Sequence, residues 1–134
     1  MRKFKILSLL LLLINISSCN SFEKSEKAPN LSEATELNSN QKIISKIDLD
    51  ENIEFGYSTQ SIKFLSKKSQ TNTLNVKIIA NENNHSIPKN YLIEKSERIQ
   101  NVLKEEMSTY RNFDKIDFRL ISEGKEVQKI IREI

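Results

Sequence analysis

The stretch that decides the fold is KNYLIEKSERIQNVLKEEMSTYR, residues 89–111. At 100° per residue its large apolar side chains fall on one stripe along one side of a helix. These side chains are Leu92, Ile99, Val102, Leu103, Met107 and Tyr110. Pro88, just before the stretch, suits the first turn of a helix. A helix with a single apolar stripe needs one apolar surface to cover, so we expect it to lie on one face of a sheet.

Three segments before this helix alternate apolar and polar residues, which is typical of strands with one wet face. They are residues 53–57, 62–64 and 74–80. The polar residues 66–73 between the last two are expected to form the loop of a β-hairpin. Ahead of the first strand, residues 41–49 have the spacing of a short helix that packs at the domain edge.

A second hairpin is expected after the helix. Residues 116–120 alternate again, and Gly124 lies in a tight-turn signal. Residues 126–134 fit either a helix by their apolar spacing or a strand returning from the turn, and we prefer the strand. The predicted class is α+β: a small antiparallel sheet, in the order β-hairpin, helix, β-hairpin, with one long amphipathic helix packed on one face.

The first eighteen residues have the three parts of a secretory leader. Arg2, Lys3 and Lys5 form a basic head, residues 6–14 form an apolar run, and small residues follow. The apolar run is shorter than the about 20 residues that a membrane-spanning helix needs. The sequence therefore predicts a signal peptide over residues 1–18.

The end of this leader, Ile16-Ser17-Ser18-Cys19, resembles the lipobox of bacterial lipoproteins. The resemblance implies cleavage between Ser18 and Cys19 and attachment of a diacylglycerol thioether, with palmitate as a typical acyl group, to Cys19. It also implies a membrane-anchored protein of the bacterial cell envelope. Because Asn20 is not the aspartate that retains many lipoproteins in the inner membrane, the implied location is the outer membrane if the cell has one. Otherwise it is the outer face of the cell membrane. The alternative is an ordinary secretory leader beside a chance cysteine, which would leave a free thiol.

Residues 19–40 are rich in Ser, Glu, Lys and Asn and predict a flexible tether, so that residues 41–134 form a single small domain. Of 21 basic and 18 acidic residues, three basic ones lie in the leader, which leaves residues 19–134 balanced in charge. A balanced domain argues against a nucleic-acid partner. Cys19 is the only cysteine, so no disulfide is expected in the domain.

Few residues suggest chemistry. His85, the only histidine, lies in an Asn-rich loop and is expected to be solvated. The acidic run that starts at Asp48 and Asp50 resembles a calcium loop, but Ile53 replaces its glycine and Thr59 its bidentate glutamate. We therefore expect no metal site and no cofactor.

Glu106 falls within the apolar stripe of the helix. A buried carboxylate there would have a raised pKa and could act as a general acid. The interpretation that we prefer is a residue at the edge of the stripe, whose stem packs while its head reaches water. No second carboxylate or histidine is placed beside it by the sequence.

These observations favour a non-catalytic, lipid-anchored protein of the envelope that binds a protein partner, as an inhibitor, an immunity-type factor or an assembly accessory. The alternatives are a small envelope hydrolase that uses carboxylates such as Glu106 or Asp48, and a lipoprotein that binds a small ligand. An exposed flat face or an open strand edge would favour protein binding. Carboxylates meeting in one cleft would favour the enzyme.

Overall fold

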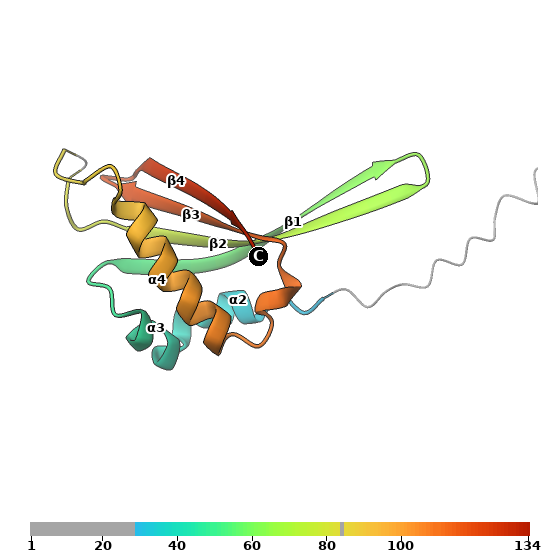
Figure 1. Ribbon diagram of the computed structural model, residues 1–134, viewed down its shortest axis with the longest axis horizontal. Coiled ribbons are helices and arrows are strands. Elements are labelled where there is room, and N and C mark those ends of the chain that lie inside the picture. Colours follow the sequence, from blue (N-terminus) through green and yellow to red (C-terminus); the bar gives the residue numbers. More distant parts are fainter. Residues whose placement is uncertain (1–28, 84) are drawn as a thin grey trace, which may run out of the picture.

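A computed structural model describes residues 29–83 and 85–134 of the chain. In chain order its elements are α2 (Glu33–Glu36), the 3₁₀ turn η1 (Leu37–Ser39), α3 (Gln41–Ile47), β1 (Asn52–Phe64), β2 (Lys67–Ile79), α4 (Tyr91–Glu106), the 3₁₀ turn η2 (Tyr110–Asn112), β3 (Lys115–Ser122) and β4 (Lys125–Glu133). The helices gather on one side of a four-stranded sheet, and the β1–β2 hairpin runs well beyond the other strands (Figure 1).

The strand order in the sheet is β1-β2-β3-β4, and β2 pairs with β3 in parallel. The predicted α+β class is confirmed, but the purely antiparallel sheet is wrong. The reason lies in α4, whose 16 residues span about 24 Å. The seven residues of β2 that pair with β3 span about 23 Å, so the helix returns the chain to the level of Thr73, where the pairing of β2 with β3 begins. The next strand must then run in the same direction as β2.

The core lies between the sheet and the helices. Its central side chains are fully buried and come from both layers: Leu74, Val76, Ile78, Ile116, Phe118 and Leu120 from the sheet, and Leu92, Ile99 and Leu103 from α4. The predicted apolar stripe is therefore the packed face of the helix. The helix is shorter than the predicted 89–111, because Met107 takes an extended backbone conformation and ends it. Met107 and Tyr110 are still buried, from the segment that follows.

The strands of the first hairpin are longer than predicted. β1 is one continuous strand over the two segments expected at 53–57 and 62–64, and the loop expected at 66–73 is wrong because β2 begins at Lys67. Residues 67–70 pair with β1 while both of their faces are exposed, so no apolar alternation marks them, and the positions that first become buried, Asn72 and Thr73, are polar. The C-terminal segment is a strand, as preferred: β4 pairs with β3 after a turn in which Glu123 and Gly124 both have positive φ.

The folded domain begins about ten residues earlier than predicted. Leu31, Ala34 and Leu37 are buried in the core, although they lie in the segment 19–40 that was expected to be a flexible tether. The few apolar residues of this polar segment do not form a pattern that predicts the packing. The predicted short helix at 41–49 is confirmed as α3, which Asn40 caps through a side-chain oxygen that accepts from the Ile43 N–H at 3.3 Å.

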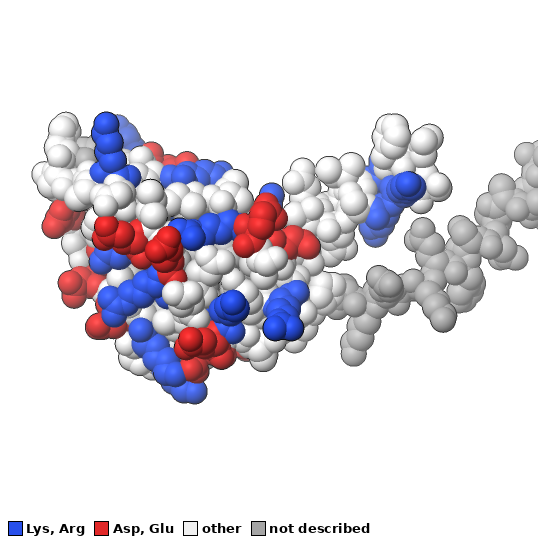
Figure 2. Space-filling model, viewed as in Figure 1, with Lys and Arg blue, Asp and Glu red and all other residues white. Residues whose placement is uncertain are grey.

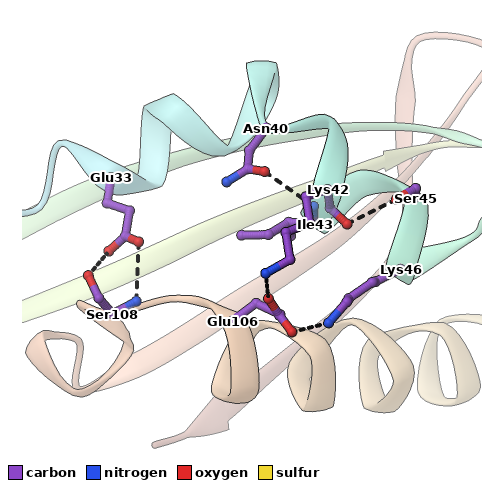
Figure 3. A network of polar contacts seen from close by, with 8 residues as sticks. All are labelled: Glu33, Asn40, Lys42, Ile43, Ser45, Lys46, Glu106 and Ser108. Atoms are coloured by element: carbon purple, nitrogen blue, oxygen red, sulfur yellow. Dashed lines mark hydrogen bonds and ion pairs between the residues drawn. The ribbon is translucent and has the colours of Figure 1, made fainter.

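Two carboxylates hold these N-terminal elements to the end of α4 (Figure 3). Glu33 accepts four hydrogen bonds from the backbone and hydroxyl groups of Ser108 and Thr109, at 2.6–3.1 Å. Burial raises the pKa of Glu33, but these hydrogen bonds outweigh it and hold the pKa below its ordinary value. Glu106 forms ion pairs with Lys46 and, at 3.0 Å, with Lys42 of α3. The N-terminal helices are thus attached by apolar packing below and by two ionised groups above.

Candidate binding surface on the projecting hairpin

The residues that carry the lipoprotein prediction, Ser18 and Cys19, lie outside the described residues. Within residues 29–83 and 85–134 no helix is both long and apolar enough to cross a bilayer. His85 is exposed in the loop before α4. Asp48 ends α3 in a left-handed conformation and pairs with Arg98 at 3.0 Å. In the same described ranges no three His, Cys, Asp or Glu side chains converge as metal ligands.

Glu106 fits neither of the two interpretations fully. Its side chain is only 15% exposed, yet it is ion-paired rather than isolated. Hydrogen bonds from Lys46 first, and then from Lys42, hold the pKa of Glu106 below its ordinary value. Glu106 therefore lacks the raised pKa that a general acid at neutral pH would need.

A broad cleft of about 1090 Å³ lies between the end of α4 and the end of β4. Its charged lining residues are Lys104, Arg111, Asp114 and Glu133. Neither Glu106 nor Asp48 lines it, so the two carboxylates suggested for an enzyme do not meet there. The larger unexplained feature of the molecule is the β1–β2 hairpin, which projects beyond the rest of the domain (Figure 1).

The outer edge of β1 is capped at Phe55 and open from Tyr57 onward. Asn38 of η1 bonds to both backbone groups of Phe55: its amide donates to the carbonyl at 2.8 Å and its oxygen accepts from the N–H at 2.7 Å. Because outward-facing residues alternate in an antiparallel pair, the backbone groups of Tyr57, Thr59 and Ser61 face the same way. Among the described residues, none bonds to them.

The edge of β2 closes at the corresponding place. Asp114 accepts from the Asn72 N–H at 2.6 Å and donates its own N–H to the Asn72 carbonyl at 2.9 Å. The Asn72 side chain is nearly buried, and its oxygen accepts from Thr59 and Gln70, both at 3.1 Å. This polar cluster fixes the point at which the two strands leave the sheet.

We call residues 58–72 the arm, residues 62–68 its tip, and the remainder of the arm its shaft. The other described residues are the body. The shaft contains only Ser, Thr, Gln and Asn. It has no proline, no charge and no bulge, which are the usual devices that keep an edge strand from pairing with another chain. A strand from a partner would therefore find free donors and acceptors along it.

The tip has a different character. Phe64 is 73% exposed, Leu65 83% and Ile62 56%, and three lysines, Lys63, Lys67 and Lys68, lie among them. Figure 2 shows the tip in blue and white with no red, whereas both charges alternate over the body. A second, smaller hollow of about 430 Å³ lies at the foot of the arm, between Pro29–Ser32 of the entering chain and the shaft residues Thr59 and Gln70.

The arm was missed because residues 66–73 were predicted to be a loop and residues 58–61 were assigned to no strand. The available signal was the pair Phe64-Leu65 among lysines, in a segment where no apolar partner strand could cover it. No protein-family model matches the chain, and neither the curated proteins nor the solved structures contain a significant match.

Proposed function

We propose that this chain is a lipid-anchored module of the bacterial cell envelope that binds a protein partner and performs no catalysis. The observation that carries the proposal is the open outer edge of β1 along the shaft. Phe55 is closed by Asn38, and the outward backbone groups of the next three alternate residues have no partner in the described structure.

Such an edge suits recognition by strand addition. An extended segment of the partner would pair with the backbone of Tyr57, Thr59 and Ser61 and continue the sheet by one strand. Main-chain hydrogen bonds supply affinity in this mode, and neighbouring side chains supply specificity. The hollow at the foot of the arm is placed to take a side chain of the incoming segment.

The proposal of a non-catalytic role is supported by the ion pairs that the candidate carboxylates form. Glu106 and Asp48, the carboxylates suggested for a hydrolase, are both ion-paired across the α3–α4 contact. Their role in this arrangement is to hold two helices together.

The strand-addition test uses a photo-crosslinking amino acid at Thr59 in living cells. We expect a discrete protein adduct, and we expect Ser61→Pro to remove it because proline lacks the outward N–H. Ser61→Ala keeps the N–H and should keep the adduct, and a crosslinker at the exposed, distant Lys89 should form none. An adduct that survives Ser61→Pro would exclude pairing at this edge.

The anchor is tested separately. Cys19→Ser should abolish incorporation of labelled fatty acid and release the protein from membrane fractions or block its processing. A Cys19→Ser protein that fractionates like the unaltered one, with no label in either, would contradict the lipobox interpretation.

A further inference from the structure

The tip of the arm exposes apolar surface that nothing in the described structure covers. Ile62, Phe64 and Leu65 lie within four consecutive positions at the end of a two-stranded projection, and all three are more than half exposed. Contiguous exposed apolar side chains mark contact sites rather than ordinary surface. Their place at the far end of the arm keeps them away from every helix of the body (Figure 1).

The arm and the body carry opposite charge. The arm contains three lysines and no acidic residue, whereas the remaining described residues contain thirteen basic and sixteen acidic side chains. The positive tip would be drawn to an anionic surface and the negative body would be held away from it. A bilayer that contains anionic phospholipid has this charge and also accepts apolar side chains at its headgroup boundary.

The turn at the tip holds a leucine in a backbone conformation that is unfavourable for residues with a side chain. Leu65 has φ 54°, in the left-handed region that favours glycine or asparagine. In the equivalent turn between β3 and β4 the two positive-φ positions are occupied by a polar residue, Glu123, and by Gly124. A large apolar side chain in a strained and solvated position is consistent with a role in contact.

The chain enters the body on the side from which the arm departs. Pro29 lies at the foot of the arm, ten positions after Cys19 in the sequence. Ten residues reach at most about 33–36 Å. The arm from Ser58 to Leu65 extends about 24 Å at 3.4 Å per residue. A lipid on Cys19 and the tip of the arm can therefore lie in one plane; this step alone rests on the anchor in the proposed function.

We propose that the tip, residues 62–68, inserts into the anionic surface of the membrane that carries the anchor. Phe64 and Leu65 enter the boundary between headgroups and acyl chains, and Lys63, Lys67 and Lys68 contact lipid phosphates. The arm then works as a second contact that fixes the orientation of the domain, with the shaft edge left open to a partner.

The test uses the chain that begins at Asn20, without leader or lipid. Every buried apolar residue of the described structure lies at or after Leu31, so this form keeps the described core. Because the sequence has no tryptophan, Phe64→Trp places a single reporter at the tip and Ile131→Trp places one on the exposed face of the sheet, where Ile131 is 51% exposed. Vesicles of equal parts phosphatidylglycerol and phosphatidylcholine should shift the emission of the Phe64→Trp reporter to the blue and leave that of Ile131→Trp unchanged.

Two sets of substitutions separate charge from apolar insertion. Replacing Lys63, Lys67 and Lys68 with Gln should lower partitioning into these vesicles by roughly 100-fold, and Leu65→Ser should lower it by about tenfold. The matched control replaces three exposed lysines of the body, Lys89, Lys104 and Lys125, and should have far less effect. Pure phosphatidylcholine vesicles should bind weakly, and added salt should release the protein from the anionic ones.

Three outcomes would overturn the proposal. The first is an emission at Phe64→Trp that anionic vesicles do not change. The second is an equal loss of binding in the tip and body lysine variants, which would show attraction by overall charge alone. The third is a tip that ignores vesicles but crosslinks to a protein from position 64 in cells. None of these depends on Cys19 or on the crosslink at Thr59, so a failure here is distinguishable from a failure of the proposed function.

Discussion

The two hairpins of this protein are built alike and supported differently. β3–β4 is held by α4, where Gln128 accepts from the Leu92 N–H at 3.0 Å and donates to the Pro88 carbonyl at 2.8 Å. β1–β2 has the same support only as far as Phe55 and Asn72, where Asn38 and Asp114 close its edges. Beyond these residues its strands continue in water. A hairpin with two strands and no covering layer is marginally stable.

This difference separates what the chain needs for folding from what it keeps for contact. The body buries most of its apolar side chains and pairs many of its charges, whereas the arm exposes its large apolar side chains and leaves its lysines without acidic partners among the described residues. Substitutions in the two regions should therefore have opposite consequences, for stability in one and for binding in the other.

The largest effect is expected in the core. Leu103 is fully buried between α4 and the sheet, so Leu103→Ala should lower the free energy of unfolding by about 2–5 kcal/mol through lost burial and the cavity that remains. Chemical denaturation measures the change. Leu65→Ala removes the same atoms from an exposed position and should change the free energy by less than about 0.5 kcal/mol. Similar losses in the two variants would abolish the distinction between body and arm.

A smaller effect is expected where the edge of β1 is closed. Asn38→Ala leaves the partly buried N–H and carbonyl of Phe55 without partners and should cost about 1–3 kcal/mol. Hydrogen exchange at the Phe55 amide should accelerate. Asn75→Ala is the control, because the Asn75 amide donates at 3.2 Å to Ser58 on the exposed face. If both variants unfold like the unaltered protein, the side-chain cap does not support the sheet.

The ion pairs of Glu106 should show in the pH dependence of stability. Since the folded pKa lies below the ordinary 4.5, the carboxylate stabilises the fold above that value and loses its contribution as pH falls through the folded pKa. Glu106→Gln should be less stable than the unaltered protein at neutral pH, and the gap should close in acid. Glu105→Gln is the matched control, one position away and exposed. Thermal melts across this pH range measure the difference in stability. A difference that widens in acid would contradict a lowered pKa of Glu106 in the folded protein.

The smallest effect on the whole molecule is expected at the tip. Leu65→Gly removes left-handed strain of about 1 kcal/mol and should slow hydrogen exchange of the tip amides while leaving global unfolding nearly unchanged. Ser66→Gly, at a position without positive φ, should bring no such gain. Faster exchange after Leu65→Gly would mean that the leucine stabilises the arm and is not retained for contact.

Much of the body could be predicted from sequence because one physical signal dominates it. The stripe that includes Leu92, Ile99 and Leu103 and the alternation around Phe118 both arise from burial of one face. The parallel pairing of β2 and β3 has no such residue signal. It follows from the length of α4 relative to the strands, which only the three-dimensional arrangement reveals.

The arm was missed for the converse reason. Residues 67–70 form a strand by backbone pairing with β1, and because all four are exposed, no buried face imposes a pattern on them. The attachment of Leu31, Ala34 and Leu37 was missed because their contacts come from distant segments. Glu106 was recognised as unusual, but its lysine partners lie 60 and 64 residues earlier in the chain, and no local spacing points to them.

The bonds of Glu33 to Ser108 and Thr109 also bear on the order of events during synthesis. They join residues 75 and 76 positions apart, and Asn30 is joined to Asn112 across 82. The first helical segment of the described residues thus finds its polar partners only when the chain is nearly finished. Until then Leu31, Ala34 and Leu37 have no complete core to enter, and the nascent protein stays open at its leading end. The N-terminal end of the domain therefore stays unpacked while the chain is synthesised, and it packs only after the last third of the chain has emerged.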